Sequence, residues 1–541
     1  MLPGAYDFAR TAWFGGIAAT GSALGHATVV SPAHGGGAVR QAQHALSDHV
    51  RSRLDGSPGA IAAAFASGDR GAIAADDDQA MRDAGLTHLL SISGLHVSAV
   101  VAATYLLAMS ILALWPWLAL RVRLPLVAAA AGALAGIAYT ILTGAEVPTV
   151  RSCIGAVLFL VALALGRDPL SLRMVAVGAL FVMVFWPEAV VGPSFQMSFG
   201  AVIAIVALHG AEPVRRFLAL REETWVARLI RQLAMLLSTG VVIELALLPI
   251  GLFHFHRAGV YGALANVIAI PLTTFGSMPL IALGLLLDSI GAGAPAWWLA
   301  GKSLEGLLAL AHWTAAQPGA VRFMPAMGNG TFALFLAGSL WLALWTGRVR
   351  LLGFAPIAVA SVALAAVPTP DLLISGDGRN VGITVGHDRL VVLREGRSTF
   401  ASDSLRELAG LDGDTVVIDD WPGARCTPDF CSIVLERGSA GHVILVGRGR
   451  DRVDEMALAA ACERSDIVVS ERWLPRSCRP RMLKADRTLL TRTGGLSVDL
   501  ESRSVRTVSE DQGHHGWYRR EELRPRYRRG GAPAVIPTAA T

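Results

Sequence analysis

Hydrophobic residues dominate the first two thirds of the chain and are distributed differently in the last third. Up to about Pro370 they form repeated runs, close to the ~20 residues that a helix needs to cross a ~30 Å hydrocarbon layer. Beyond Pro370 charged residues are frequent, and hydrophobic residues alternate over short segments. The pattern predicts a polytopic α-helical membrane protein of about ten spans, followed by a C-terminal α/β or α+β domain. The expected spans are residues 85–110, 124–143, 151–165, 174–186, 198–209, 232–250, 263–288, 297–316, 331–346 and 351–367.

One of these runs is compatible with either one or two crossings of the membrane. Residues 263–288 contain Pro271 and Pro279, and proline interrupts the hydrogen bonding of a helix. If the run forms two spans instead of one, every later segment changes its side of the membrane.

The stretch from Gly85 to Ser110, GLTHLLSISGLHVSAVVAATYLLAMS, places polar residues at the start of an apolar run. On one helix at about 100° per residue, His88, Ser91, His96 and Ser98 share a broad face, and Ser93 is a further polar candidate. Polar groups at membrane depth cost free energy unless they meet partners or water, so we expect this face to line a helix bundle or an aqueous passage. Alternatively, the serines bond to their own helix and the histidines pair with neighbouring helices.

Other polar residues lie beside prolines in the apolar region. Arg151 follows Pro148, and His254 and His256 follow Pro249. Helices broken at membrane depth are tolerated where they line a cavity. Arg151 therefore has two interpretations: it contacts a phosphate, or it extends to the interface or pairs with Glu146.

Composition supports a membrane protein, since 53% of the 541 residues are hydrophobic and only 16% are charged. The net charge of +5 carries no inference about nucleic acid, because arginines gather in the cytoplasmic loops of membrane proteins. The loops with Arg121 and Arg123, with Arg167 and Arg173, with Arg215 to Arg231, and with Arg348 and Arg350 alternate with loops poor in arginine. We expect the basic loops in the cytoplasm, and both the N-terminal segment and the C-terminal domain on the external face.

Two shorter N-terminal features and the C-terminal tail complete the outline. Residues 41–68 suit an amphipathic helix, and Asp76, Asp77 and Asp78 suit a helix start better than a cation site. Residues 516–541 are basic and contain proline, so we expect a disordered tail.

The segment after Pro370 has the pattern of a mixed domain. The strands expected are VGITVGHDRLVVL, DTVVIDD, GHVILVG, SDIVVSE and GGLSVDL, with helices at 403–408 and 451–462. Its four cysteines, Cys426, Cys431, Cys462 and Cys478, form an even set, which favours two disulfides outside the cytosol, most simply Cys426 with Cys431, although three pairings are possible. Other pairings, free thiols and a zinc site are the alternatives.

Several motifs together resemble the ComEC family of competence proteins, which are bacterial DNA-uptake channels. They are HLLSISGLHV, TGAEVPTVRSCIGAVLFL, GRDPLSL, PSFQMSFGAVIAI and LLPIGLFHF with GALANVIAIPL, in this order over residues 60–345. The resemblance implies passage of single-stranded DNA through the bacterial inner membrane, with other competence proteins as partners and a homo-oligomer as a further candidate assembly. His88, Ser91, Ser93, His96, Arg151, His254 and His256 are then candidates for the lining of the passage.

Three further segments are interpreted by the same resemblance. Residues 1–60 resemble the end of the family's N-terminal extracytoplasmic region, and residues 61–367 its channel domain. Residues 371–515 resemble a metallo-β-lactamase-like domain, but His387, His442, His514 and His515 do not reproduce its H-x-H-x-D-H ligand pattern. We therefore expect no metal, no cofactor and no enzymatic activity.

Two alternative functions use the same residues. A serine and a histidine of SISGLH could serve as nucleophile and base of an intramembrane hydrolase, although no glycine-flanked nucleophile motif is present. The broken helices also suit a transporter of small solutes or lipids.

Overall fold

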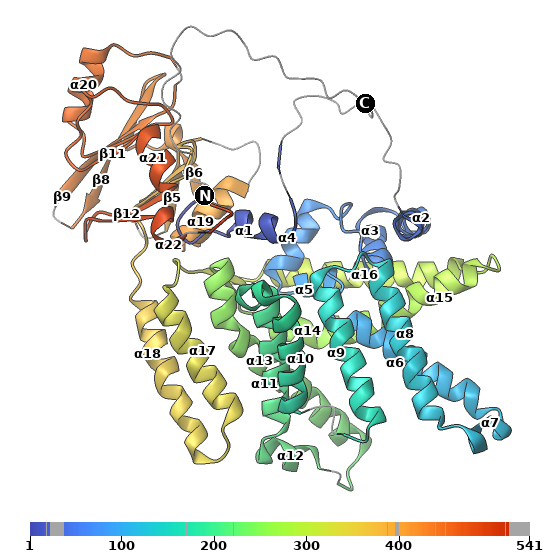
Figure 1. Ribbon diagram of the computed structural model, residues 1–541. Helices are drawn as coiled ribbons and strands as arrows, with labels where there is room; N and C mark the ends of the chain where they lie inside the picture. The colour runs from blue at the N-terminus through green and yellow to red at the C-terminus, as the bar shows by residue number, and fades with distance from the viewer. Residues whose placement is uncertain are drawn as a thin grey trace, which may run out of the picture. The chain divides into compact units, whose positions relative to one another are not determined.

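The computed structural model describes residues 1–17, 19–21, 37–167, 171–219, 221–386, 388–394, 400–438, 440–449, 451–513 and 515–518. Within it the chain forms two compact units (Figure 1). Residues 22–367 form the helical unit, and residues 1–21 join residues 368–541 in the C-terminal unit.

The helical unit consists of helices and one short antiparallel ribbon. The ribbon pairs β1 (Arg257–Gly259) with β2 (Val321–Phe323). The helices are α2 (Ala38–Arg53), α3 (Gly56–Ser67), α4 (Ala75–Asp83), α5 (Thr87–Leu90), α6 (Gly94–Ala113), α7 (Pro116–Arg121), α8 (Leu124–Leu142), α9 (Val147–Ala164), α10 (Leu172–Phe185), η1 (Pro187–Val191), α11 (Pro193–His209), α12 (Glu212–Leu218), α13 (Trp225–Phe255), α14 (Gly262–Pro271), η2 (Leu272–Ser277), α15 (Met278–Asp288), α16 (Ala294–Ala315), α17 (Asn329–Leu344), η3 (Arg348–Gly353) and α18 (Phe354–Ala365).

The expected fold class is confirmed, with a lower number of long spans than the ten predicted. In the described residues, five helices are long and apolar enough to cross a membrane, or six if the bent pair α11 and α12 forms one span. Three shorter apolar helices, at 148–164, 172–185 and 329–344, account for other predicted runs. The long spans expose much of their apolar surface, including Leu106, Leu134 and Leu245, as lipid-facing helices do.

Two predicted runs differ in detail from the structure. Residues 262–288 form one helical segment in which a π-helical turn, η2, follows Pro271, so the prolines do not divide it into two separate helices. The run at 297–316 forms α16, which carries the ion pair of Lys302 and Glu305 and is not among the apolar candidate spans. The predicted helix at 41–68 is wrong as one element, because α2 ends at Arg53 and α3 starts at Gly56.

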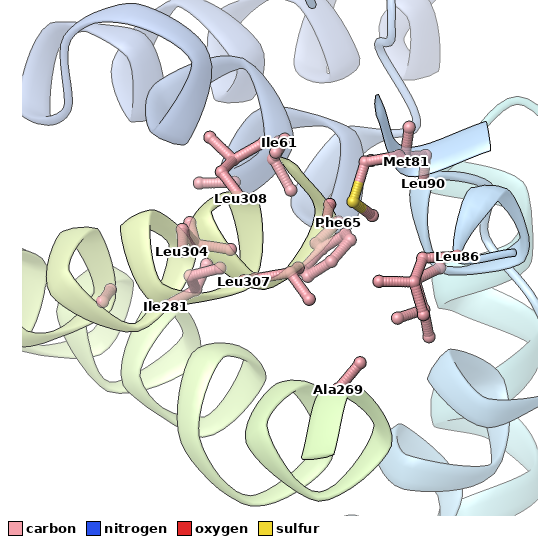
Figure 2. Close-up of a cluster of buried hydrophobic side chains, with 14 of the residues drawn as sticks. Ile61, Phe65, Met81, Leu86, Leu90, Ala269, Ile281, Leu304, Leu307 and Leu308 are labelled. Carbon is pink, nitrogen blue, oxygen red and sulfur yellow. The ribbon is translucent and has the colours of Figure 1, made fainter. Parts of the chain in front are cut away.

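The largest core of the helical unit packs α16 against helices from the N-terminal part of the chain. Figure 2 shows Ile61 and Phe65 of α3 beside Leu304, Leu307 and Leu308 of α16. Met81, Leu86 and Leu90 come from α4, α5 and the turn between them, and Ala269 and Ile281 come from α14 and α15. Apolar burial of this kind fixes the segment that precedes α6.

The C-terminal unit contains two mixed sheets. The six-stranded sheet has the order β13-β12-β3-β4-β5-β6, and the five-stranded sheet has the order β11-β10-β9-β8-β7. The strands are β3 (Leu372–Ile374), β4 (Val381–Val385), β5 (Arg389–Val392), β6 (Thr415–Val417), β7 (Ala424–Cys426), β8 (Phe430–Arg437), β9 (Ala440–Gly447), β10 (Ile467–Val469), β11 (Leu483–Ala485), β12 (Leu496–Asp499) and β13 (Ser504–Thr507). The helices are α1 (Phe8–Phe14), α19 (Phe400–Ala409), η4 (Ile418–Asp420), α20 (Glu455–Glu463), α21 (Arg487–Thr493) and α22 (Val508–Asp511).

The facing sides of the two sheets share one core. Ile374 and Ile383 of the first sheet pack in one cluster with Ile433 and Val446 of the second. An ion pair also links the sheets: Arg437 of β8 pairs with Asp371 and donates to the backbone oxygen of Thr384 at 2.8 Å. Alternating sequences predicted β4, β5, β6, β9, β10 and β12 correctly, whereas alternation did not identify β3, β7, β8, β11 and β13.

The first residues of the chain belong to the C-terminal unit. Leu2 is buried in a cluster with Leu373, Leu390 and Leu405. The hydroxyl of Tyr518 donates to Asp7, and the ring of Trp517 lies 5.6 Å from that of Phe14. The predicted tail is described only as far as Tyr518, so residues 519–541 lie outside the described part of the chain.

Candidate functional site

The predicted continuous helix over residues 85–110 is wrong, because the chain breaks at its polar centre. Thr87–Leu90 form α5, Ser91 to Ser93 leave the helix, and α6 starts at Gly94. Leu89 and Leu90 are buried in the main core, so α5 is anchored there. The polar residues do not share one face, since His96 is buried while His88 and Ser98 are exposed.

Ser93 and His96 together cap the start of α6. The hydroxyl of Ser93 accepts from the amide of Leu95 at 3.3 Å, and Nδ1 of His96 accepts from the amide of Ser93 at 3.3 Å. This α6 cap is a capping box, with His96 in the position usually taken by Glu or Gln. Because free amides at a helix start need acceptors, the pair explains why the chain re-enters a helix here.

The other side of the His96 ring is without a hydrogen bond. The side chain is fully buried, its ring lies 4.8 Å from that of Phe65, and Nε2 has no partner among the described residues. Since Nδ1 accepts, a neutral ring carries its proton on Nε2. Buried donors without an acceptor are uncommon in proteins.

Helix α9 packs beside the break between α5 and α6. Thr149, almost fully buried, donates to the backbone oxygen of Ile92 at 3.4 Å. Gly94 at the start of α6 faces Ser152 of α9, and a Cβ atom there would lie 3.5 Å from the Ser152 hydroxyl, an ordinary contact distance. Neither Thr149 nor Ser152 was selected as a candidate from the sequence pattern.

Arg151 lies on the same turn of α9 and contacts α11. Its Nη2 donates to the backbone oxygen of Ser194 at 3.1 Å, while its buried Nε has no hydrogen-bond partner among the described residues. The suggested pairing with Glu146 does not occur, because Glu146 pairs with Arg70 at 3.5 Å. Arg151 is thus a half-buried cation without an ion-pair partner in the described part of the chain.

His254 reaches the same part of α11. Its Nε2 lies 2.9 Å from Oε1 of Gln196, whose amide nitrogen donates to the backbone oxygen of Val190 at 3.2 Å. Arg151, Ser194, Gln196 and His254 therefore form a polar junction of α9, α11 and α13. Gln196 was recognisable in the sequence only as an isolated polar residue in an apolar run.

His256 lies two residues after His254, at the end of α13. It ends α13 in the left-handed region, with φ of 55°, and its backbone oxygen accepts from the amide of Met324 at 2.9 Å. Its position directly before β1 supports a structural role at this turn.

A half-buried acid inside α13, Glu244, was not selected from the sequence. The carboxylate of Glu244 accepts from the amide of Ala263 at 2.7 Å and so caps the start of α14. Gly262 leaves room for this contact, since a Cβ there would lie 3.1 Å from Oε1 of Glu244. Gly85 packs against Gly262 in turn, which ties α14 to the turn before α5.

The C-terminal unit shows two disulfides, Cys426–Cys431 and Cys462–Cys478, and Cys153 of α9 is free and buried. Among the described residues, Asp419, Cys426 and Cys431 are the group of three whose potential metal ligands lie within 4.8 Å of one another. The two sulfurs are bonded to each other, and Asp419 pairs with Arg448. His387 and His514 lie outside the described residues, and His442 and His515 belong to no such group.

Comparison with known proteins places this helical arrangement in a family. The family model described as "Competence protein" matches residues 65–349, more than half of the chain. The chain belongs to the competence protein family. Both the α6 cap and the polar junction lie inside the competence match, and the C-terminal unit from Pro368 onward lies outside it.

Individual competence relatives are similar over shorter segments. Competence protein ComA of Neisseria gonorrhoeae is 40% identical over 129 residues, covering 24% of this chain and 18% of ComA. Recombination protein 2 of Haemophilus influenzae is 27% identical over 261 residues, 46% of this chain and 31% of that protein. ComE operon protein 3 of Bacillus subtilis is 24% identical over 234 residues, 43% of this chain and 27% of that protein. The chain thus matches less than a third of the length of each, and no solved structure matches it.

Proposed function

We propose that the helical unit is a passage for single-stranded DNA across the bacterial cytoplasmic membrane. The observation that carries the proposal is Arg151, a half-buried cation of the apolar region whose Nε has no partner and which has no carboxylate beside it among the described residues. A cation at membrane depth is costly and usually marks the path of a charged solute. The names of the relatives ComA and Recombination protein 2 connect such proteins to competence and recombination.

The chemistry of the polar junction suits a phosphate chain in transit. A polyanion needs polar groups along its route, but many cations would hold it too tightly, because each phosphate contact adds affinity. Arg151 supplies one charge, and Gln196 and His254 supply further polar groups at the same junction.

The sidedness proposed from the arginine loops agrees with the arrangement of the helical unit. The basic helices α7 and α12 lie at one end of this unit, and α3 and α4 lie at the other end (Figure 1). With the basic end in the cytoplasm, we assign α2 to α4, the residues before them and the C-terminal unit to the external side. We propose no enzymatic role for the C-terminal unit.

The intramembrane hydrolase is the weaker proposal. Ser93 Oγ lies 3.1 Å from Nδ1 of His96, which is hydrogen-bond distance for a nucleophile and its base. However, the same atoms already cap α6, and no acidic residue contacts His96 among the described residues. A catalytic pair would need a third group to orient the histidine.

Uptake of labelled DNA tests the passage with three variants in a competent host that lacks its own uptake channel. We expect Arg151→Gln to lower uptake by about tenfold or more, because the charge that compensates phosphate is lost, and Arg151→Lys to retain part of it. Arg70→Gln is the matched control, since Arg70 already pairs with Glu146. Immunoblotting of membranes should show equal amounts of each variant. Wild-type uptake by Arg151→Gln would refute the assigned role.

A further inference from the structure

The two disulfides of the C-terminal unit differ in exposure and in the chain that they close. Cys426 of β7 is exposed and lies directly opposite the buried Cys431 of β8. Cys462 of α20 and Cys478 are both at most 1% exposed. The first bond joins residues 5 apart in sequence and the second joins residues 16 apart.

This difference decides which bond a thiol can reach. Exchange starts when a thiolate attacks one sulfur of a disulfide, so at least one sulfur must be accessible. Cys426 offers such a sulfur on β7, the edge strand of its sheet. Both sulfurs of the other bond are enclosed by Phe430, Leu445, Leu458 and Val468.

The surroundings of Cys431 favour its sulfur as the leaving group of the exchange. Nη1 of Arg448 lies 3.8 Å from Sγ of Cys431. A guanidinium at this distance stabilises a thiolate, and a stabilised thiolate leaves more easily. Arg448 is itself held by two hydrogen bonds to Asp419, one of them 2.8 Å long.

Opening this bond leaves the hairpin of β7 and β8 supported by other contacts. The amide of Thr427 donates to the backbone oxygen of Phe430 at 2.8 Å, and the Thr427 hydroxyl accepts from the Phe430 amide at 3.1 Å. Strand β8 is also paired with β9 from Phe430 to Arg437. A bond that closes so short a loop adds little to the stability of the fold.

We propose that the Cys426–Cys431 disulfide is a thiol–disulfide exchange site for a thiol or dithiol reductant. The thiolate of the reductant forms a bond to Sγ of Cys426, the Cys426–Cys431 bond breaks, and the electron pair leaves on Sγ of Cys431 beside Arg448. A second thiolate then attacks the reductant's sulfur in the mixed disulfide and releases Cys426. Two thiols are oxidised to one disulfide, and their two protons pass to the two cysteines.

The first test is stepwise reduction of the full-length chain in detergent by glutathione, followed by alkylation and mass spectrometry of cysteine peptides. We expect the peptides of Cys426 and Cys431 to become alkylated while Cys462 and Cys478 remain joined. The second disulfide is the internal control, because it belongs to the same unit. Simultaneous reduction of both, or earlier reduction of Cys462–Cys478, would overturn the proposal.

The second test separates the charge of Arg448 from mere loosening of the strands. Arg448→Gln and Asp419→Asn break the same ion pair. If the guanidinium assists the leaving sulfur, Arg448→Gln slows reduction by about threefold and Asp419→Asn accelerates it, because a negative charge beside the thiolate is removed. Arg448→Lys keeps the charge and should remain near the wild-type rate. A change in the same direction in Arg448→Gln and Asp419→Asn contradicts the assigned role.

Discussion

Individual polar side chains of the helical unit have two different roles. Ser93, His96 and Glu244 satisfy backbone amides at helix starts, and their hydrogen bonds account for their positions. Arg151 differs from these residues, because no carboxylate compensates its charge and its Nε is without a partner among the described residues. Burial of an unpaired polar group costs free energy, so such a residue is the better candidate for contact with a solute.

His96 allows its two possible roles to be separated by substitution. Gln is a favoured residue at this position of a capping box, so His96→Gln should keep most of the α6 cap, whereas His96→Leu should lose about 1 kcal/mol of stability. Thermal unfolding of the purified protein in detergent measures this difference. If Nε2 of His96 contacts DNA, both variants lose uptake although only His96→Leu is destabilised. Full uptake by His96→Gln would restrict His96 to its structural role.

At the scale of elements, one carboxylate links α2 to the loop after α3. Asp69 accepts from the Ser47 hydroxyl at 2.7 Å and pairs with Arg51, both on α2. The hydrogen bond from Ser47 lowers the pKa of Asp69 below its usual 3.8, and the Gly71 amide and Arg51 add to this effect, against the opposing effect of burial. A carboxyl group whose pKa is lower in the folded state stabilises that state above its usual pKa, and this stabilisation is lost as the pH falls through the lower value.

We therefore expect Asp69→Asn to loosen α2 at pH 7, because the charged acceptor is gone. The difference from the wild type should shrink as the pH is lowered below 3.8, where the wild-type carboxylate also becomes protonated. Hydrogen exchange of α2 amides, corrected for intrinsic rates, measures the effect. Asp48→Asn on the exposed side of α2 is the control and should behave as wild type. Equal protection of α2 in Asp69→Asn and wild type at pH 7 would contradict this prediction.

At the scale of the whole molecule, the shared unit of residues 1–21 and the C-terminal segment constrains the membrane topology. Leu2 and Asp7 contact residues that follow Pro368, so we expect both ends of the helical unit to lie on the same side of the membrane. The chain between them must cross an even number of times. Six spans, with α11 and α12 as one, satisfy this condition, and so does any even number that includes some of the shorter apolar helices.

Labelling of single introduced cysteines in whole cells tests this parity. We expect Thr11→Cys and Glu501→Cys, both at exposed positions of the C-terminal unit, to react with a membrane-impermeant maleimide to the same extent. Arg215→Cys in the basic helix α12 should react only after permeabilisation. Labelling of Thr11→Cys and Glu501→Cys from opposite sides would show that the two segments do not share one unit in the cell.

The sequence by itself determined the properties that depend on neighbouring residues. Apolar runs predicted a helical membrane region, and alternation predicted β4, β9 and β10, because the spacing of apolar residues follows the period of each element. The motif from His88 to His96 and the isolated Arg151 were recognisable as candidates for the same reason.

Only the tertiary structure decided what these residues contact. In the structure the helix is interrupted at Ser91–Ser93, and Glu146 pairs with Arg70 instead of Arg151. Leu2 packs in the core of the C-terminal unit. The tertiary structure also distinguished the exposed Cys426 from the enclosed Cys462. Burial and pairing bring together residues that are distant in the chain, and the periodicity of a single segment contains no information about such partners.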